Sequence, residues 1–374
     1  MQKSCNGANL LKNIDHEDYV IERFTIDREK FDEFSKLITQ VFTNDENALV
    51  EGASIAFSEE TFNIIYGAPS IDKDLFIRAI HKQTGQLVGF LGSIPRNLSI
   101  MGKVYKFAVP SWLCVHSQHQ KKGLAKSMGK KLFETGLAKG YDGGFSLHEP
   151  EQHGIDVSTS VSRENEIPLQ RVVTLTKFVI KAFDVDKVAT VVKLRWYEKL
   201  VFKLYTKVKT INSNQIRQHQ EKDILDMFEI IQEQVKRNQL SIVPELEDFK
   251  WMLKNSNVNC VVHEDNEGKI KGFMLAWEFY LAGFRNKIPF GWLDMVHILR
   301  LNTKEASNLA NYLSQTSKER GWIGLQTPYI PYFDMKPLKK AKFFFFSKKI
   351  NLDLFNMNNV PIPEKIESFY FDWR

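Results

Sequence analysis

Cysteine is scarce in this sequence, and long apolar runs are absent. Three cysteines in 374 residues are too few, and too odd in number, for a disulfide framework, which excludes the disulfide-stapled secreted class. A reducing interior fits better, and we expect a cytoplasmic protein. The run Phe343–Phe346 is among the longest apolar stretches, far below the ~20 residues of a membrane span. We therefore expect no integral membrane span and no signal peptide.

A strong charge of one sign is also missing. Lysine and arginine number 51 and aspartate and glutamate 45, so the net charge is +6. That balance suits an anionic ligand but is too small to indicate nucleic-acid binding. Hydrophobic residues at 43% and aromatic residues at 12% exclude a disordered chain and provide for real cores. The chain is longer than one hydrophobic core usually organises, so we expect two domains. We also expect a monomer.

Hydrophobic periodicity predicts alternating helices and strands along the chain. The predicted helices are 28–41, 59–66, 123–139, 185–205 and 224–235. The predicted strands are 19–24, 76–80, 87–94, 107–115, 145–147, 258–263 and 270–279. The polar stretch 207–214 reads as a linker. It separates an expected N-terminal domain, 1–206, from a C-terminal domain, 207–374.

The second half repeats features of the first. Gly85–Phe90 resembles Gly268–Phe273, Trp112-Leu113 recurs as Trp292-Leu293, and a helix ends in Gly140-Tyr141 as another ends in Gly321-Trp322. All three pairs are separated by 180 to 183 residues, which indicates an internal duplication. The alternative is two unrelated α/β domains that share turn glycines.

The strongest local signal is Gln120-Lys121-Lys122-Gly123-Leu124-Ala125, between a predicted strand and a predicted helix. The first N–H groups of a helix bind anions, and a glycine lets the backbone approach a pyrophosphate closely. Two lysines add positive charge beside that site. By itself the pattern is equally compatible with an exposed basic turn that caps an amphipathic helix.

The context of this loop resembles the GNAT acyltransferases, and most closely the protein N-myristoyltransferases. The Gln-x-x-Gly-x-Ala form is that of the GNAT coenzyme A loop, and Leu113-Cys114-Val115-His116 resembles the strand before it in N-myristoyltransferases. Asp45-Glu46-Asn47 and Leu87–Phe90 also resemble segments of that family, and Leu240–Val243 and Glu264–Gly268 occur in the family's order, so the resemblance runs from about Tyr19 to the C-terminus. It implies an α/β (α+β) fold of tandem GNAT-type domains, with mixed, mostly antiparallel sheets, flanking helices and pseudo-two-fold symmetry.

The resemblance also implies a reaction and its residues. The N-terminal glycine amine of a peptide or protein would attack the thioester of myristoyl-CoA directly, and the amides of Trp112 and Leu113 would hold the oxyanion. The hydroxyl of Ser241 would contact the amine. Acyl-CoA would be bound in the first domain, with the acceptor toward the second, by residues of one strand and the following loop: Leu113, Cys114, Val115, Gln120, Lys121, Lys122, Gly123, Leu124 and Ala125.

Several departures from the family pattern keep two other functions open. That family's base is its C-terminal carboxylate, whereas this sequence stops at Arg374, directly after an aromatic strand, which leaves the base unassigned. One alternative is a GNAT acetyltransferase that acts on a lysine or a small amine, favoured by the loop's form. The other is an acyl-CoA-binding protein without turnover, favoured by the missing tail.

Four weaker motifs have simpler interpretations. Tyr197-Glu198-Lys199-Leu200 lies too late in the chain for an acetyltransferase acid, and Cys114 with His116 lacks a third orienting group, so we expect Cys114 to be a core residue. The cluster of His148, Glu149, Glu151 and His153 fits no standard spacing, and we expect no metal. Phe343–Phe346, flanked by lysines, could suggest contact with a membrane or RNA, but a core-facing strand between solvated lysines is the simpler interpretation.

Overall fold

The computed structural model describes residues 14–150 and 154–373, and the chain divides into two compact units. Unit 1 comprises residues up to 41, 70–174 and 349–366, and unit 2 comprises 42–69, 175–348 and 367 onward. Each compact unit is therefore made of several separate segments of the chain. The contiguous domains 1–206 and 207–374 remain a prediction about the sequence.

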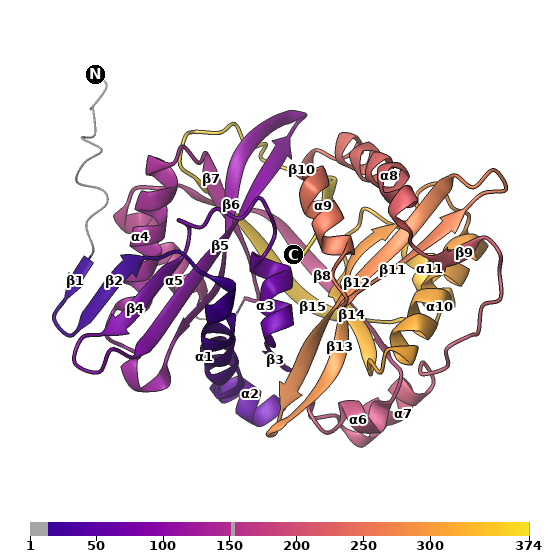
Figure 1. Ribbon diagram of the computed structural model, residues 1–374, viewed down its shortest axis with the longest axis horizontal. Helices are drawn as coiled ribbons and strands as arrows, with labels where there is room; N and C mark the ends of the chain where they lie inside the picture. The colour runs from indigo at the N-terminus through magenta and orange to yellow at the C-terminus, as the bar shows by residue number, and fades with distance from the viewer. Residues whose placement is uncertain (1–13, 151–153, 374) are drawn as a thin grey trace. The chain divides into compact units, whose positions relative to one another are not determined.

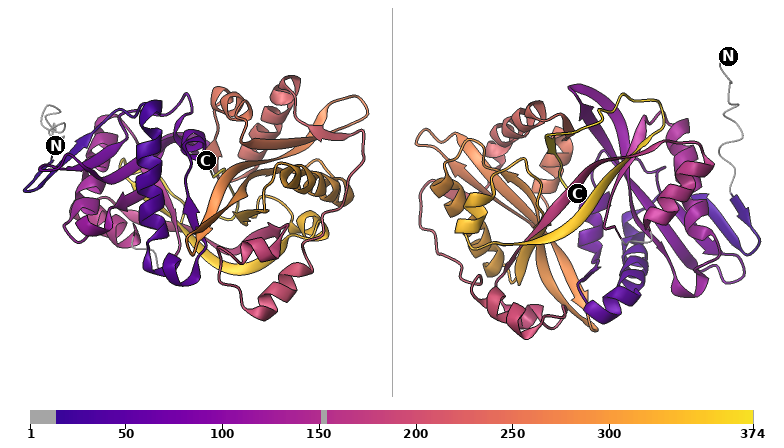
Figure 2. Two further views of the ribbon diagram at one scale, coloured as in Figure 1. Left: turned by 60° about the horizontal axis from the view of Figure 1, so that its bottom comes forward. Right: turned by 180° about the vertical axis from the view of Figure 1, so that it is seen from behind.

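Unit 1 is a sheet of seven consecutive strands, most of them antiparallel, in the order β1-β2-β4-β5-β6-β7-β15. Its strands are β1 (Ile14–His16), β2 (Tyr19–Arg23), β4 (Ile77–His81), β5 (Leu87–Ile100), β6 (Lys103–Val115), β7 (Gly143–His148) and part of β15 (Phe344–Asn356). Its helices are η1 (Arg28–Lys30), α1 (Phe31–Thr43, which ends in unit 2), η2 (Ser117–His119), α4 (Leu124–Ala138) and α5 (Gly154–Glu164). Figures 1 and 2 show α1 on one face of this sheet and α4 with α5 on the other.

Within unit 2 the paired strands follow the order β8-β14-β13-β12-β11-β9. Its strands are part of β8 (Leu169–Ala182), β3 (Ser54–Ala56), β9 (Ile216–Gln218), β10 (Leu240–Val243), β11 (Val258–Glu264), β12 (Ile270–Gly283), β13 (Asn286–His297), β14 (Gly324–Pro328) and β16 (Phe369–Tyr370). Its helices are α2 (Glu46–Glu51), α3 (Glu59–Tyr66), α6 (Val185–Val188), α7 (Trp196–Lys203), η3 (Glu221–Asp223), α8 (Ile224–Arg237), α9 (Leu246–Leu253), α10 (Thr303–Glu319) and α11 (Met335–Lys340).

Alternation along the central strands of unit 2 builds two core layers. In β11, Cys260 and Val262 pack with α8 and α9, whereas Val261 packs with α10 on the opposite face. In β12, Phe273 and Leu275 likewise belong to the first layer and Met274 to the layer on the opposite face. Side chains of a strand point alternately to its two faces, so a strand covered on both sides is apolar throughout.

The internal repeat is visible in the order of the elements. The succession β4-β5-β6-α4-β7-α5 is matched by β11-β12-β13-α10-β14-α11, and each element of the second set begins 179 to 183 residues after its counterpart. The strand that follows each set pairs with a strand of the other set. β8, which follows the first set, pairs with β14, and β15, which follows the second, pairs with β7. The predicted fold class, a mixed and mostly antiparallel α/β structure with flanking helices, is confirmed.

The predicted helix over 185–205 is wrong as one continuous helix. It is α6 and α7, separated by a segment whose backbone groups bond elsewhere: Ala53 N–H donates to Val191 O, Lys193 N–H donates to Glu51 O, and Val192 bridges Gly52. A helix through 189–195 would forfeit these bonds. The other predicted helices and strands are present, with shifted ends.

Lys181 is a fully buried lysine of β8 that connects this strand by hydrogen bonds to two other segments of unit 2. Its Nζ donates to the carbonyl oxygens of Tyr205 (2.7 Å), Lys207 (2.8 Å), Ala341 (3.1 Å) and Lys342 (3.2 Å). Burial, together with the positive charge of Lys342, lowers the pKa of Lys181 to about 7. The ammonium has three N–H donors and the neutral amine two, so the four carbonyls share these donors and have fewer of them above that pH.

Replacing Lys181 with methionine should destabilise the protein strongly. Methionine is of similar length but donates nothing, and each buried carbonyl left unsatisfied costs about 1–3 kcal/mol. We expect a loss of roughly 2–4 kcal/mol in the free energy of unfolding, measured by urea denaturation. Lys177→Met, at an exposed lysine of the same strand, is the control and should change it by less than about 0.5 kcal/mol. Equal effects of the two substitutions would contradict the role given to Lys181.

No helix within residues 14–150 and 154–373 has both the length and the apolar character needed to cross a bilayer.

Candidate acyl-CoA site

A β-bulge lies in β6 where the oxyanion residues are predicted. The β5–β6 register passes from Phe90 opposite Cys114 to Gly92 opposite Ser111, so Leu91 faces two residues, Trp112 and Leu113. Trp112 has a φ of 59°, in the left-handed region that a bulky residue rarely occupies. A bulge interrupts the ladder and turns its backbone groups in new directions, and it frequently lies beside an active site.

The predicted coenzyme A loop follows this strand and ends in a helix start. Lys121 and Gly123 have φ values of 62° and 78°, and α4 begins at Leu124 with no side chain capping its first N–H groups. Backbone N–H groups that include left-handed residues form concave anion sites, and the helix dipole favours negative charge there. The Gln120 side chain donates to Val115 O at 3.2 Å, which ties the loop back to β6.

The sheet of unit 1 fixes the direction of α4. Leu124, Met128 and Leu132 of α4 are buried in one cluster with residues of β2, β4 and β5. A Cβ on Gly89 would lie 3.0 Å from the methyl carbon of Met128, so glycine there lets the helix approach β5 closely. The helix start is therefore held by the core beside the end of β6.

The predicted coenzyme A residues differ in what they can offer a ligand. The side chains of Cys114, Val115 and Leu124 are buried, so these three can contribute only backbone groups. Leu113 and Ala125 are half-buried. The exposed members are Gln120, Lys121, Lys122 and Gly123.

A histidine cluster beside the loop was not predicted from the sequence. Lys122 Nζ donates to the Tyr19 hydroxyl at 2.9 Å, and that hydroxyl is 2.9 Å from His119 Nδ1. The rings of His81 and His116 lie 5.3 and 5.7 Å from that of His119. The hydrogen bond from Lys122 to Tyr19 raises the pKa of Lys122, whereas partial burial and the nearby His81, His116 and Lys122 lower that of His119. The positive charge at this end of the loop therefore rests on lysine.

Cys114 is unsuited to nucleophilic attack. Its side chain is buried, and burial raises the pKa of its thiol to about 12. The thiolate is the reactive form, and at neutral pH almost none would exist. Cys114 is therefore a buried core residue and not a nucleophile.

Ser241 lies in unit 2, in β10, with a fully buried side chain. Its hydroxyl donates to Val235 O at 3.2 Å, and Leu240 and Ser241 pair in parallel with Phe369 and Tyr370 of β16. The hydroxyl could accept a hydrogen bond from an amine only if the ligand reached this buried position, so the contact expected for Ser241 stays a prediction. Arg374 and its carboxylate lie outside the described residues.

His148, at the end of β7, is the member of the predicted acidic and histidine cluster whose contacts within unit 1 the structure gives. His148 Nε2 is 2.6 Å from Asp353 Oδ2, and Arg171 Nε donates to Asp353 Oδ1 at 3.0 Å. Burial alone would raise the pKa of Asp353, but the hydrogen bonds from His148 and Arg171 lower it. Glu151 and His153 lie outside the described residues. Within the described ranges no three histidine, cysteine or acidic side chains gather as metal ligands would.

Comparisons with known proteins agree with this geometry. Residues 9–134 match the family model described as Myristoyl-CoA:protein N-myristoyltransferase, N-terminal domain, a range that contains both the bulge and the loop. The predicted resemblance to N-myristoyltransferases is confirmed.

Glycylpeptide N-tetradecanoyltransferases are among the curated relatives. That of Kluyveromyces lactis is 28% identical over 207 residues, which cover 54% of this chain and 42% of the relative. That of Plasmodium falciparum is 22% identical over 253 residues, covering 66% and 56%. The chain spans about half the length of these relatives.

Solved N-myristoyltransferases share the fold. A Saccharomyces cerevisiae N-myristoyltransferase crystallised with bound myristoyl-CoA superposes with a TM-score of 0.71 at 18% identity, covering 92% of this chain and 80% of that one. A second structure of the yeast N-myristoyltransferase with bound myristoyl-CoA and inhibitors gives a TM-score of 0.72, with 94% and 86% covered. At this identity the likeness establishes the N-myristoyltransferase fold.

Proposed function

We propose that this chain is an acyl-CoA-dependent N-acyltransferase that transfers a myristoyl or related fatty acyl group to the N-terminal glycine amine of a peptide or protein. The observation that carries the proposal is the bulge at Trp112-Leu113, immediately before the anion-binding loop 120–125. A thioester held with its pyrophosphate on that loop needs backbone donors nearby for its oxyanion, and β6 offers an interrupted ladder there.

The reaction proceeds by direct transfer. The neutral amine attacks the thioester carbon to form the C–N bond, and the amides of Trp112 and Leu113 hold the resulting oxyanion. When the oxyanion collapses, the C–S bond breaks, the nitrogen loses one proton and the thiolate takes one up, so that coenzyme A leaves as its thiol. An N-terminal amine has a pKa of ~7.7–8.0, against ~10.4 for lysine, so weak or water-mediated base catalysis suffices.

The same proposal extends to the domains and the compartment. The first domain, 1–206, would bind acyl-CoA, and the second, 207–374, would serve the acceptor. The free, buried cysteines Cys114 and Cys260 fit a reducing compartment, which supports the cytoplasm. An acetyltransferase acting on a lysine or small amine is the second candidate, favoured by the Gln-x-x-Gly-x-Ala form of the loop.

Gly123→Val should weaken acyl-CoA binding by roughly tenfold or more, which corresponds to ~1.4 kcal/mol. Valine disfavours the left-handed φ of 78°, and its branched side chain would obstruct close approach to the phosphates. Isothermal titration calorimetry measures the effect. Gly140→Val is a matched control, because Gly140 has a φ of 70° just beyond the other end of α4 and open space around its Cβ position. Equal losses in both variants would show that strain, and not ligand contact, is responsible.

Ser241→Ala should lower kcat/KM for a glycine-starting peptide by roughly tenfold to a hundredfold, through poorer orientation of the amine. Binding of acyl-CoA should not change. Cys114→Ala serves as the control and should retain most of its activity, since no acyl-cysteine forms. An acyl-enzyme isolated on Cys114, or ping-pong kinetics, would refute direct transfer, and an unchanged kcat/KM in Ser241→Ala would remove that residue from the site.

A further inference from the structure

Helix α7 of unit 2 turns a broad apolar face to solvent. Trp196, Leu200 and Leu204 follow one another at a spacing of four residues and are 74%, 57% and 73% exposed. Side chains at this spacing lie on one side of a helix. Tyr197 and Val201 form a second exposed row beside them, and α7 has no buried residue. Single exposed apolar side chains are ordinary, but a contiguous patch indicates a binding surface.

Positive charge surrounds this apolar face. Residues 193–209 contain five lysines and one arginine but a single acid, Glu198. The Glu198 carboxylate accepts a hydrogen bond from the N–H of Arg195 at 2.7 Å and so caps the start of α7. Lys193 and Lys203 form ion pairs with Glu51 (3.1 Å) and Asp186 (3.2 Å). The positive charge beside the apolar side chains therefore comes mainly from Arg195, Lys199, Lys207 and Lys209.

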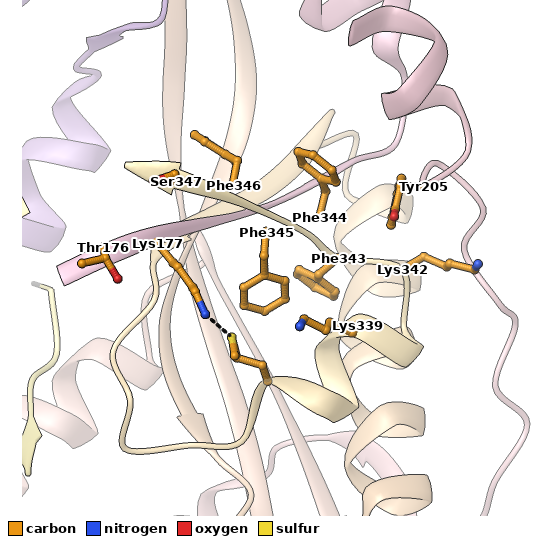
Figure 3. A pocket seen from close by; sticks show the side chains of 11 residues that line it. Thr176, Lys177, Tyr205, Lys339, Lys342, Phe343, Phe344, Phe345, Phe346 and Ser347 are labelled. Atoms are coloured by element: carbon orange, nitrogen blue, oxygen red, sulfur yellow. Dashed lines mark hydrogen bonds between the residues drawn. The ribbon is translucent and has the colours of Figure 1, made fainter. Parts of the chain in front are cut away.

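An aromatic cavity rimmed by lysines adjoins α7. It has a volume of about 650 Å³, and Figure 3 shows the rings of Phe343, Phe344 and Phe345 on its wall with Lys339 nearby. Phe343 is buried and Phe345 is half-buried against the same core cluster, which fits the expected core-facing strand, whereas Phe344 and Phe346 are half-buried and lie outside that cluster. Residues 336–349 contain six lysines and no acid.

The helix and the cavity form one surface. The rings of Phe202 and Tyr205 lie 5.1 and 5.2 Å from that of Phe344. Lys181 bonds carbonyl groups of both segments, as described above, and so fixes residues 205–207 beside 341–342. We call residues 193–209 together with 336–349 the basic aromatic face.

We propose that the basic aromatic face docks the protein on an anionic lipid bilayer. Trp196, Leu200 and Leu204 would enter the boundary between headgroups and acyl chains, and the surrounding lysines would contact lipid phosphates and carboxylates. An amphipathic helix with tryptophan and leucine on one side and basic residues around them is typical of interfacial helices. Each lysine near an anionic surface adds attraction that salt screens. This proposal does not depend on the acyltransferase function.

A bilayer explains the face better than the other polyanions do. A nucleic acid would engage the lysines, but phosphates and sugars would leave the leucines exposed to water. An acidic partner protein or a second copy of this chain would need its own matching apolar surface. Only an anionic membrane offers, in one partner, a continuous apolar layer under a layer of negative charge.

Vesicle flotation of the full chain tests the proposal. We expect binding to phosphatidylcholine vesicles that contain phosphatidylserine, little binding to pure phosphatidylcholine, and release as salt rises. A triple variant, Trp196→Ser with Leu200→Ser and Leu204→Ser, should bind at least roughly tenfold more weakly. Leu225→Ser is the matched control, because Leu225 is a 66% exposed leucine of α8 outside the face. Lys339→Gln with Lys342→Gln should reduce binding to the anionic vesicles.

Three results would overturn the proposal. The first is no flotation of the wild-type chain with anionic vesicles. The second is an equal loss of binding in Leu225→Ser and in the triple variant. The third is a wild-type dimer in sedimentation experiments that the triple variant abolishes, without vesicle binding, which would assign the face to a second copy. Circular dichroism confirms that each variant is folded before it is compared.

Discussion

Myristoyl-CoA should bind this chain at least ~10³-fold more tightly than acetyl-CoA. The two acyl groups differ by about twelve CH₂ groups, and each buried CH₂ contributes ~0.8 kcal/mol, for a total near 10 kcal/mol. Even half of this exceeds the ~4.1 kcal/mol that corresponds to a thousandfold difference. An enzyme specific for a long chain must bury most of these groups, whereas an acetyltransferase has no place for them.

Competition binding, with myristoyl-CoA kept below its critical micelle concentration, measures the ratio of the two affinities. Free coenzyme A is the control, because it reports the loop 120–125 without any acyl chain, and its affinity should be close to that of acetyl-CoA. Gly123→Val should weaken all three ligands by a similar factor. Comparable affinities for myristoyl-CoA and acetyl-CoA would contradict the fatty acyl assignment and favour the acetyltransferase.

Trp112→Pro should reduce kcat by roughly 10²-fold or more, which is the typical effect of losing one oxyanion donor. Proline has no N–H, and its ring holds φ near about −65°, so it removes both the donor and the left-handed bulge at Trp112. Trp112→Gly keeps the N–H and readily adopts a φ of 59°. The glycine variant should therefore retain far more activity than the proline variant.

Single-turnover kinetics with saturating acyl-CoA make this comparison. Near-native circular dichroism and acyl-CoA affinity in the proline variant are required before its rate is interpreted. If both variants lose activity equally, the indole side chain and not the backbone is the functional element. If neither loses activity, the oxyanion is held elsewhere.

Local signals explain most of the agreement between sequence and structure. The loop 120–125 was predictable because its glycine, its lysines and the following helix are adjacent in the sequence. The break between α6 and α7 was not, because Val191 and Val192 bond to the distant Gly52 and Ala53. Tertiary hydrogen bonds therefore override the local helix propensity of this segment.

Features that depend on pairing between strands could not be predicted from the sequence. The left-handed conformation of Trp112 depends on the register between β5 and β6, which no local pattern encodes. Tyr19, His81 and His119 come from three separate segments, and only the fold brings them to the same end of the loop. The candidate loop could therefore be placed between its strand and its helix from the sequence, whereas its backbone geometry and its neighbouring histidines could not be predicted.

The transfer itself is the most direct test of the acyltransferase. The purified chain is incubated with myristoyl-CoA and a glycine-starting peptide, and thiol release is followed together with the intact mass of the peptide. The same peptide with an acetylated N-terminus is the control. We expect thiol release matched by a peptide carrying one myristoyl group on its terminal amine, and neither with the blocked peptide. Tight binding of myristoyl-CoA without thiol release above the hydrolysis blank would contradict the account and leave an acyl-CoA-binding protein.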